Sequence, residues 1–359
     1  MSDSLDWLRL YRSENVGPAT FFRLIERYSK PGKALEALPE LAGRAGKKKI
    51  SVYSKDAAEK ELAALHKLGA RLLLADDPAY PEALRALEIA PLLAIIGNSA
   101  LLTRPAVAIV GGRDASMNGR KIAHVMATTL GQTGFTIISG LARGIDTAAH
   151  QGSLATGTVA VLAGGVDHVY PPENAKLHAA IAERGCLVSE MPPGFVPQAR
   201  DFPRRNRIVS GLAQGVVVIE AKIRSGSLIT ARMALEQGRE LFAVPGSPLD
   251  SRSQGCNALI KQGAALAENA EDVIEALGML PLPRPATREI SATMPVEDDK
   301  TASEAQKSVL ALLDVTAVTV DEILRQCQLS PSTLSLVLLE LELAGRLERH
   351  PDMSVSLRV

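Results

Sequence analysis

The chain has 359 residues, of which 46% are apolar and 22% are charged, so it can bury a large core in two or three domains and is not disordered in bulk. Its 40 lysines and arginines balance its 40 aspartates and glutamates, which argues against a protein that coats nucleic acid by bulk charge but leaves room for a local basic groove. The three cysteines, Cys186, Cys256 and Cys327, lie far apart, which fits a reducing cytosol and offers no zinc site. The N-terminus lacks the pattern of a signal peptide, and no apolar run approaches the roughly 20 residues of a membrane helix. We therefore expect a cytoplasmic protein with no membrane segment.

Residues 1–100 are predicted to form a small helical domain. Apolar residues recur at helical spacing on both sides of a turn that contains Val16, Gly17 and Pro18. This order is typical of a helix-hairpin-helix or SAM-like domain, in which backbone N–H groups at the start of the second helix can hold a DNA phosphate. A helix pair that only packs is an equally good interpretation, because glycine turns between helices are common. The run at 92–97 predicts a short strand that leads into the next domain.

Residues 101–279 alternate short apolar runs with glycine-rich turns and amphipathic stretches. Strands are predicted at 106–110, 135–138, 159–162, 187–189, 216–219 and 241–244. This alternation is typical of an α/β fold with a parallel sheet and crossover helices, so we expect all of these strands to run parallel. Ligands of such sheets bind at the carboxyl ends of the strands, where this chain places glycine, serine and arginine.

The C-terminal part is predicted to be a linker followed by a small domain. Residues 280–302 are rich in proline and then charged without a pattern, which indicates a linker. Residues 303–359 show three helices and an alternating strand, the order of a winged helix. Its expected recognition helix, from Ser330 to Gly345, has no lysine or arginine and carries Glu340 and Glu342. Because phosphate contacts need cations, a structural or protein-interaction role is favoured over the reading of duplex DNA.

Three of the predicted turns carry residue types that receive phosphate. After the first central strand, Gly111 and Gly112 let the backbone approach a ligand, and Arg113 can form a forked contact with phosphate oxygens. The other two turns contribute Ser139, Gly140, Arg143, Ser225 and Ser227. A tight turn between strand and helix is the alternative interpretation. Several such turns on one edge of a sheet predict a path for a polyanion rather than a single nucleotide pocket.

The hexapeptide from Phe202 to Arg207 combines an aromatic ring with Arg204, Arg205 and Asn206 at a helix entry. We expect Phe202 to stack on an unpaired base while Arg204 and Arg207 hold the flanking phosphates. The competing interpretation is that Phe202 is a hydrophobic staple that packs on the helix and never meets DNA.

Chemistry beyond binding has little support in the sequence. Asp146 and His150 lie four residues apart on one helix face, but no second His or Cys accompanies them, so capping by Asp146 and packing by His150 are favoured over catalysis. The chain has no G-x-x-x-x-G-K-[ST] loop, no G-x-G-x-x-G fingerprint and no Ser/His/Asp or metal-ligand set. We therefore expect no catalytic residue, no cofactor and no metal, and a protein that is not an enzyme.

Taken together, these segments resemble the DNA-processing protein A family, also called DprA or Smf. The match covers about half of the chain, in the family's order, at 108–113, 139–146, 161–165, 170–171, 189–190, 202–209, 225–231 and 243–246. The helical front part and the winged-helix tail are also similar to the longer family members. One departure is Gly112, where the family usually has serine, so a hydroxyl contact is not expected at this position, whereas the contact of Arg113 is.

The resemblance implies an extended Rossmann-like parallel sheet with helices on both faces, which dimerises and binds single-stranded DNA without strong sequence preference. It also implies loading of the recombinase RecA during natural transformation and recombination, with no catalysis. The residues that we expect to bind nucleic acid are Gly111, Arg113, Ser139, Gly140, Arg143, Gly164, Phe202, Arg204, Arg205, Asn206, Arg207, Ser225 and Ser227.

The alternative is a nucleotide-binding enzyme of the phosphoribohydrolase type on a related sheet. Such enzymes use a P-G-G-x-G-T loop followed by a glutamate that acts on the ribose. The corresponding segment here is 225–230, which lacks the paired glycines, and Glu236 follows Thr230 by six residues. Release of free base from a nucleotide would favour the enzyme, and a gel shift with a single-stranded oligonucleotide would favour the binding protein.

Overall fold

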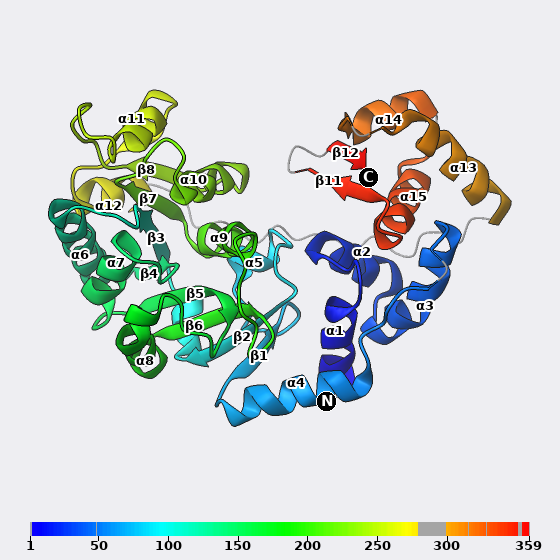
Figure 1. Cartoon of the computed structure of the whole chain (residues 1–359), viewed down its shortest axis with the longest axis horizontal. Coiled ribbons are helices and arrows are strands. Elements are labelled where there is room, and N and C mark those ends of the chain that lie inside the picture. Colours follow the sequence, from blue (N-terminus) through cyan, green and yellow to red (C-terminus); the bar gives the residue numbers. More distant parts are fainter. Residues whose placement is uncertain are drawn as a thin grey trace. The chain divides into compact units, whose positions relative to one another are not determined.

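The computed structural model describes residues 2–47, 49–278, 299–314, 316–327, 329–350 and 354–358 (Figure 1). These residues belong to two compact units, one made of residues 1–60 with 287–359 and the other of residues 61–286. Most of the predicted linker at 280–302 lies outside the described residues, and its last residues already belong to a helix that begins at Asp299. Within the described part of the chain, no helix is both long and apolar enough to cross a membrane.

The unit of residues 61–286 is built on a nine-stranded sheet in the order β1-β2-β6-β5-β4-β3-β7-β8-β9. The strands are β1 (Arg71–Leu74), β2 (Leu92–Gly97), β3 (Ala106–Gly111), β4 (Thr136–Ser139), β5 (Thr158–Gly165), β6 (Cys186–Met191), β7 (Gly215–Ile219), β8 (Glu240–Ala243) and β9 (Ala265–Leu266). Strands β3 to β9 pair in parallel, as the apolar runs predict. Their carboxyl ends therefore meet at one edge of the sheet.

Two parts of the sequence-based layout need correction. Strands β1 and β2 belong to this sheet, although residues 71–97 were assigned to the helical domain. The sheet is also not parallel throughout, because β2 pairs antiparallel with both β1 and β6. The apolar run from Leu92 to Ile95 is buried, so pairing with β6 removes it from water, and nothing local in the run specifies the strand direction.

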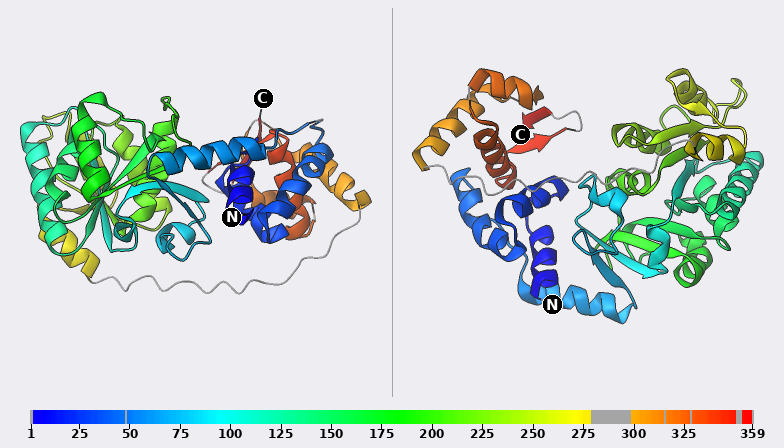
Figure 2. Two further views of the ribbon diagram at one scale, coloured as in Figure 1. Left: turned by 90° about the horizontal axis from the view of Figure 1, so that it is seen from below. Right: turned by 180° about the vertical axis from the view of Figure 1, so that it is seen from behind.

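Helices cover both faces of the sheet (Figure 1, Figure 2). The helices of this unit are α5 (Glu82–Arg85), α6 (Met117–Gln132), α7 (Ile145–Ser153), α8 (Ala175–Arg184), α9 (Asp201–Leu212), α10 (Gly226–Glu236), α11 (Gln254–Lys261) and α12 (Ala270–Gly278), and α4 (Lys55–Lys67) leads into it. Alternate residues of β3 face opposite sides, so Val107 and Ile109 pack in one core with α6, α7 and α12. Helices α9 and α10 lie against the sheet on the other side and carry residues of the site described below.

The other unit combines the two ends of the chain. Its N-terminal part contains α1 (Ser2–Arg12), α2 (Pro18–Tyr28) and α3 (Pro31–Arg44), with the predicted turn at 16–18 between the first two helices. Its C-terminal part contains α13 (Asp299–Leu312), β10 (Val318–Thr319), α14 (Val320–Cys327), α15 (Pro331–Leu343), β11 (Leu347–Arg349) and β12 (Ser354–Leu357). Ser330 caps α15 by accepting the N–H of Thr333 at 3.0 Å, and the three strands form an antiparallel sheet in the order β10-β12-β11. The winged-helix prediction is therefore confirmed.

Candidate nucleic-acid interface

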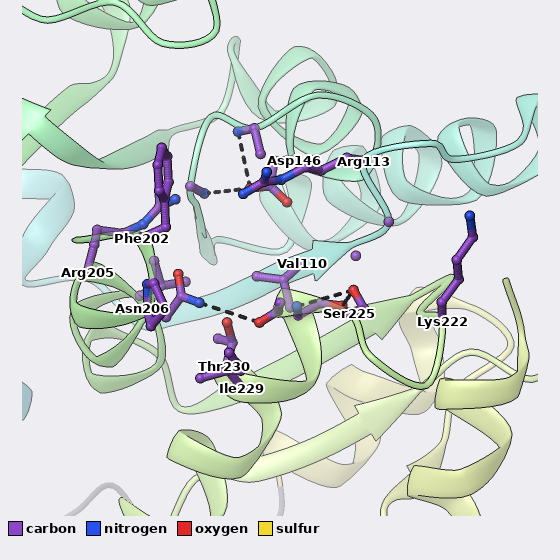
Figure 3. Close-up of a pocket in the computed structure, with 18 of the residues that line it drawn as sticks. Val110, Arg113, Asp146, Phe202, Arg205, Asn206, Lys222, Ser225, Ile229 and Thr230 are labelled. Atoms are coloured by element: carbon purple, nitrogen blue, oxygen red, sulfur yellow. Dashed lines mark hydrogen bonds between the residues drawn. The ribbon is translucent and has the colours of Figure 1, made fainter. Parts of the chain in front are cut away.

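A cavity of about 730 Å³ opens at the carboxyl ends of β3 and β7, in the size range of ligand-binding sites (Figure 3). Its walls come from the loop after β3, the loop between β7 and α10, the first turns of α9 and α10, and Arg252 from the loop after β8. Segments from different parts of the sequence therefore meet at one place, as expected for the carboxyl edge of a parallel sheet.

The loop after β3 can follow its path only because it begins with glycine. A Cβ atom at Gly111 would lie 1.9 Å from the carbonyl oxygen of Ile219, and one at Gly112 would lie 2.8 Å from that of Glu220. Ser116 then caps α6 by accepting the N–H of Gly119 at 2.9 Å. The carboxylate of Glu220, just after β7, accepts both the N–H of Ser116, at 2.7 Å, and its hydroxyl. Glu220 thereby fixes two neighbouring loops of the cavity to each other.

One face of α9 points into the cavity. Phe202, Arg205, Asn206 and Val209 line it, at the i, i+3, i+4 and i+7 positions of a single helix face. The guanidinium carbon of Arg113 lies 5.4 Å from the centroid of the Phe202 ring, within the range of a cation–π contact. The ring of Tyr170 lies 5.2 Å from that of Phe202, centroid to centroid. Because Phe202 is the second residue of α9, it does not occupy the position of a hydrophobic staple, which precedes the helix.

The first turn of α10 forms the opposite wall. Ser225 caps this helix by accepting the N–H of Ser227 at 3.3 Å, and the two hydroxyl oxygens lie 2.7 Å apart. Asn206 donates from Nδ2 to the carbonyl of Gly226 at 3.5 Å, which links α9 to α10 across the cavity (Figure 3). Hydroxyls and backbone N–H groups at a helix start favour an anion, so this wall suits a phosphate.

The charge of the cavity is positive. The lining side chains include five cations against three anions, namely Arg113, Arg205, Lys222, Arg224 and Arg252 against Asp114, Asp146 and Glu220. Among these lining groups, Lys222 lies 3.9 Å from Asp114, and both side chains are largely exposed. Exposed pairs of this kind hold weakly, so Lys222 remains available to a phosphate chain. Arg252 pairs instead with Asp250 at 2.7 Å.

Two buried side chains of opposite charge, Asp146 and Arg205, lie in the inner wall of the cavity. The carboxylate of Asp146 accepts the N–H groups of Gly140, at 3.2 Å, and Ala142, at 3.3 Å, so it caps the turn after β4 rather than the helix, whose N-cap residue is Gly144. Burial raises the pKa of Asp146, and the charge of Arg205 opposes this shift. Burial lowers the pKa of Arg205 to about 10, so its guanidinium stays protonated at neutral pH. Arg205 donates to the carbonyl of Val161 and is only 8% exposed. It therefore anchors α9 to β5 and supplies positive charge to the inner wall of the cavity.

His150 makes the stability of this unit dependent on pH. Its ring is fully buried, with Nδ1 2.7 Å from the hydroxyl of Thr158, and burial lowers its pKa to about 3. Because the unfolded chain binds a proton near the ordinary histidine pKa of about 6.5 and the folded chain does not, this group reduces stability as the pH falls from there toward 3. Between pH 6 and 4, we expect the unfolding free energy of His150→Gln to decrease less steeply with falling pH than that of the wild type, by up to about 1.4 kcal/mol per pH unit. Urea unfolding at a series of pH values measures this slope. An identical pH slope in the variant and the wild type would contradict this assignment.

The structure brings eight of the predicted site residues to the large cavity: Gly111, Arg113, Gly140, Phe202, Arg205, Asn206, Ser225 and Ser227. Arg143 and Gly164 instead line a smaller cavity of about 170 Å³, which shares Arg113 and Phe202 with the first. Arg143 is 60% exposed and forms an ion pair with Glu173 there.

Three other predictions place residues at the site that the structure uses elsewhere. Ser139 is fully buried and its hydroxyl donates to the carbonyl of Ile109 at 2.6 Å, so it joins β4 to β3. Arg207 donates to the carbonyl of Ile89 and to the carboxylate of Glu190, and Arg204 lies 3.6 Å from the same carboxylate. Arg204 and Arg207 thus lie outside the cavity that Phe202 lines, and their contact with the flanking phosphates stays a prediction. The physical reason is the helical period, since positions 204 and 207 lie off the face of α9 that carries Phe202 and Arg205.

The sequence reasoning also missed residues that line the large cavity. They are Tyr170, Glu220, Lys222, Arg224, Thr230 and Arg252. Lys222 and Arg224 directly precede a turn that was already expected to bind anions. Their location beside this turn is the signal by which the sequence could have identified them as site residues. Tyr170 and Arg252 reach the site only through the fold. Glu236, the candidate acid of the alternative enzyme, is exposed at the last position of α10 and does not line the cavity.

The fold and the site define a class of multidomain proteins in which a Rossmann-like sheet with a cationic cavity accompanies a helix-hairpin-helix and a winged helix. Three family models match the chain: DNA recombination-mediator protein A at residues 71–278, the DprA-like N-terminal HHH domain at 1–64 and the DprA winged helix domain at 292–353. The chain belongs to the DNA recombination-mediator protein A family, which confirms the resemblance, the helix-hairpin-helix and the winged helix.

Individual relatives agree with this assignment. Protein Smf of Escherichia coli is 36% identical over 365 residues, which cover 100% of this chain and 97% of that protein. The solved structure of DNA processing protein A from Streptococcus pneumoniae has a TM-score of 0.64 at 35% identity, over 77% of this chain and 97% of that one. A structure that describes the single-stranded DNA binding mode of DNA processing protein A from Helicobacter pylori has a TM-score of 0.54 at 30% identity, over 58% of this chain and 95% of that one.

Proposed function

We propose that the chain binds single-stranded DNA in the cavity at the carboxyl ends of β3 and β7, without strong sequence preference. The observation that carries this proposal is the placement of Arg113 over the ring of Phe202, facing the anion-binding start of α10. An aromatic ring beside cations is the combination with which single-strand binders stack bases and hold phosphates. Neither feature depends on the identity of a base, so little sequence preference is expected. The single-stranded DNA binding described for the relative from Helicobacter pylori supports the proposal.

We also propose that the chain loads the recombinase RecA onto the bound strand during natural transformation and recombination, and that it acts as a homodimer through the domain of residues 101–279. The description of the family as recombination mediators supports the first part. Faster assembly of RecA filaments on protein-covered single strands, and a sedimentation mass of twice the monomer, would be the expected results. Filament assembly unaffected by the chain would contradict the loading role.

The direct test of strand binding compares a single-stranded oligonucleotide with the corresponding duplex at two salt concentrations, by fluorescence anisotropy. We expect tighter binding of the single strand and an affinity that falls as salt rises, with a slope of about −0.7 for each phosphate contact. An affinity that is independent of salt would exclude a phosphate-binding cavity.

Replacing Phe202 by Ala tests the stacking contact. We expect the affinity for the single strand to fall by a factor of roughly 5 to 100, which corresponds to the 1–3 kcal/mol of one stacked base. The melting temperature should change little, because Phe202 is only half-buried and faces the cavity. Binding and thermal unfolding are measured on the same preparation. Normal binding by the folded variant would show that the cations alone form this part of the site.

A further inference from the structure

Helix α15, the recognition helix of the winged helix, packs against the N-terminal helices α2 and α3 within one compact unit (Figure 1). Asn15, in the hairpin turn, donates from Nδ2 to the carbonyl of Leu343 at 2.9 Å. Arg346 donates to the carbonyl of Ala45 at 3.4 Å, and Ala45 is buried in the same apolar core as Val309 and Leu341. The contact therefore joins the N-terminal helices to the winged helix within this unit.

Two carboxylates of α15 meet arginines of the N-terminal helices. Glu342 lies 2.7 Å from Arg23 of α2 and 3.4 Å from Arg349 of β11. The nearly fully buried Glu340 lies 3.7 Å from Arg44 of α3, which also pairs with Glu40 of its own helix at 2.7 Å. Burial lowers the pKa of Arg349, and the positive charge of Arg23 lowers it further. The guanidinium groups of Arg23 and Arg349 repel each other and are both close to the carboxylate of Glu342. The two arginines thus resemble an anion-binding site in which a carboxylate of the chain itself is the bound anion.

The carboxylates stand where phosphates could bind. Arginine forms the same forked contact with carboxylate and with phosphate oxygens. Helix α15 carries no lysine or arginine, and its two charged residues, Glu340 and Glu342, are both acidic. Its charge therefore has the same sign as a DNA backbone. Arg23 lies on α2, the helix that begins at the hairpin turn, and such a helix start favours phosphate as well.

We propose that α15 is a removable acidic cap over a phosphate-binding face of the N-terminal helices, on which Arg23 and Arg44 hold the backbone of duplex DNA when the cap is released. Both arginine side chains keep partial exposure, 22% for Arg23 and 33% for Arg44, so salt and a competing polyanion can weaken their contacts with α15. Duplex rather than single-stranded DNA is the expected ligand because Trp7, Tyr11 and Phe21, which form the aromatic cluster of α1 and α2, are buried. The face therefore offers charge without an aromatic platform for unpaired bases.

The test uses the full chain with Glu342→Gln, which keeps the shape of the side chain and removes its charge. Glu348→Gln is the matched control, because Glu348 is exposed on β11 and changes the net charge equally. Duplex binding is measured by fluorescence anisotropy over a salt series, and release of the cap is followed by hydrogen exchange of the α15 amides. We expect faster α15 exchange and about tenfold tighter duplex binding in Glu342→Gln than in the control, with a salt slope steeper by about 0.9 for each phosphate gained.

A second substitution added to Glu342→Gln shows which residues cause the tighter duplex binding. Addition of Arg23→Ala should abolish it, whereas addition of Arg113→Ala, in the cavity of the other unit, should not. Equal duplex affinity of Glu342→Gln and Glu348→Gln in proteins whose α15 amides exchange faster would overturn the proposal. If hydrogen exchange of α15 is unchanged in Glu342→Gln, the charge-reversal variant Glu342→Arg is compared with Glu348→Arg in the same way. α15 amides that remain equally protected in Glu342→Arg would show that the ionic contacts of Glu342 do not keep α15 on the N-terminal helices, and would overturn the proposal.

Discussion

Arg113→Ala is expected to lower the affinity for single-stranded DNA by roughly 10- to 100-fold, the range of a charge-assisted hydrogen bond of about 1.5–3 kcal/mol. The guanidinium of Arg113 lines both cavities and lies over the ring of Phe202, so its removal takes away a cation and one partner of the aromatic ring. Because a phosphate contact reads no base, the loss should be similar for all sequences, and the salt slope should become shallower by about 0.7.

Arg120→Ala is the matched control for this experiment. Arg120 is exposed on α6, only seven residues away, and does not line either cavity, so the same change of charge should leave the affinity nearly unchanged. Both variants are measured by anisotropy on several oligonucleotide sequences and over a salt series. Equal losses in the two variants would mean that Arg113 acts only through net charge, and a loss confined to one sequence would mean that it reads a base.

The second large effect is expected on stability rather than on binding. Arg205→Leu should reduce the unfolding free energy of the unit of residues 61–286 by about 3–5 kcal/mol, the usual effect of leaving a buried charge without the opposite charge that compensates it. The substitution removes the hydrogen bond to the carbonyl of Val161 and leaves the buried carboxylate of Asp146 without the nearby positive charge that opposes its raised pKa. The double variant Arg205→Leu with Asp146→Leu should recover part of the loss, because no uncompensated charge then remains.

Arg204→Leu tests whether this effect depends on burial. Arg204 precedes Arg205 on α9 but is 44% exposed, so its replacement should change the unfolding free energy by less than about 1 kcal/mol. Urea unfolding followed by circular dichroism compares the three variants. A loss at Arg204 as large as that at Arg205 would contradict the buried role of Arg205, and a double variant less stable than Arg205→Leu would contradict the coupling to Asp146.

The order of structural elements was open to prediction because it depends on local patterns. Alternating apolar runs and glycine turns identified the strands from β3 to β8, and the helical spacing with Ser330 as a cap identified the winged helix. The same patterns brought Gly111, Arg113 and Ser225 to the cavity, since these residues lie at or after the ends of strands whose carboxyl ends must share an edge in a parallel sheet. These features are encoded over a few residues, so their prediction needs no knowledge of distant partners.

The contacts of the individual arginines on α9 could not be predicted from the local sequence pattern. The hexapeptide contains three arginines, but the helical period directs Arg205 into the inner wall of the cavity and Arg207 toward Ile89 and Glu190. Which arginine meets solvent depends on the packing of α9 against the sheet, and this packing involves residues more than a hundred positions away.

The sequence by itself determined the parallel core, the turns rich in glycine, serine and arginine at its strand ends and the absence of cations from the last long helix. Only the tertiary structure decided that β1 and β2 extend the sheet, that Glu220 joins two loops through Ser116, and that α15 lies against α2 and α3. The physical reason is that burial of apolar surface selects partners by shape and area, without regard to their separation along the chain. From the sequence, Glu342 can be predicted only to be an acidic residue on a helix. Its partner Arg23 is 319 positions away, and only the fold places the two side chains 2.7 Å apart.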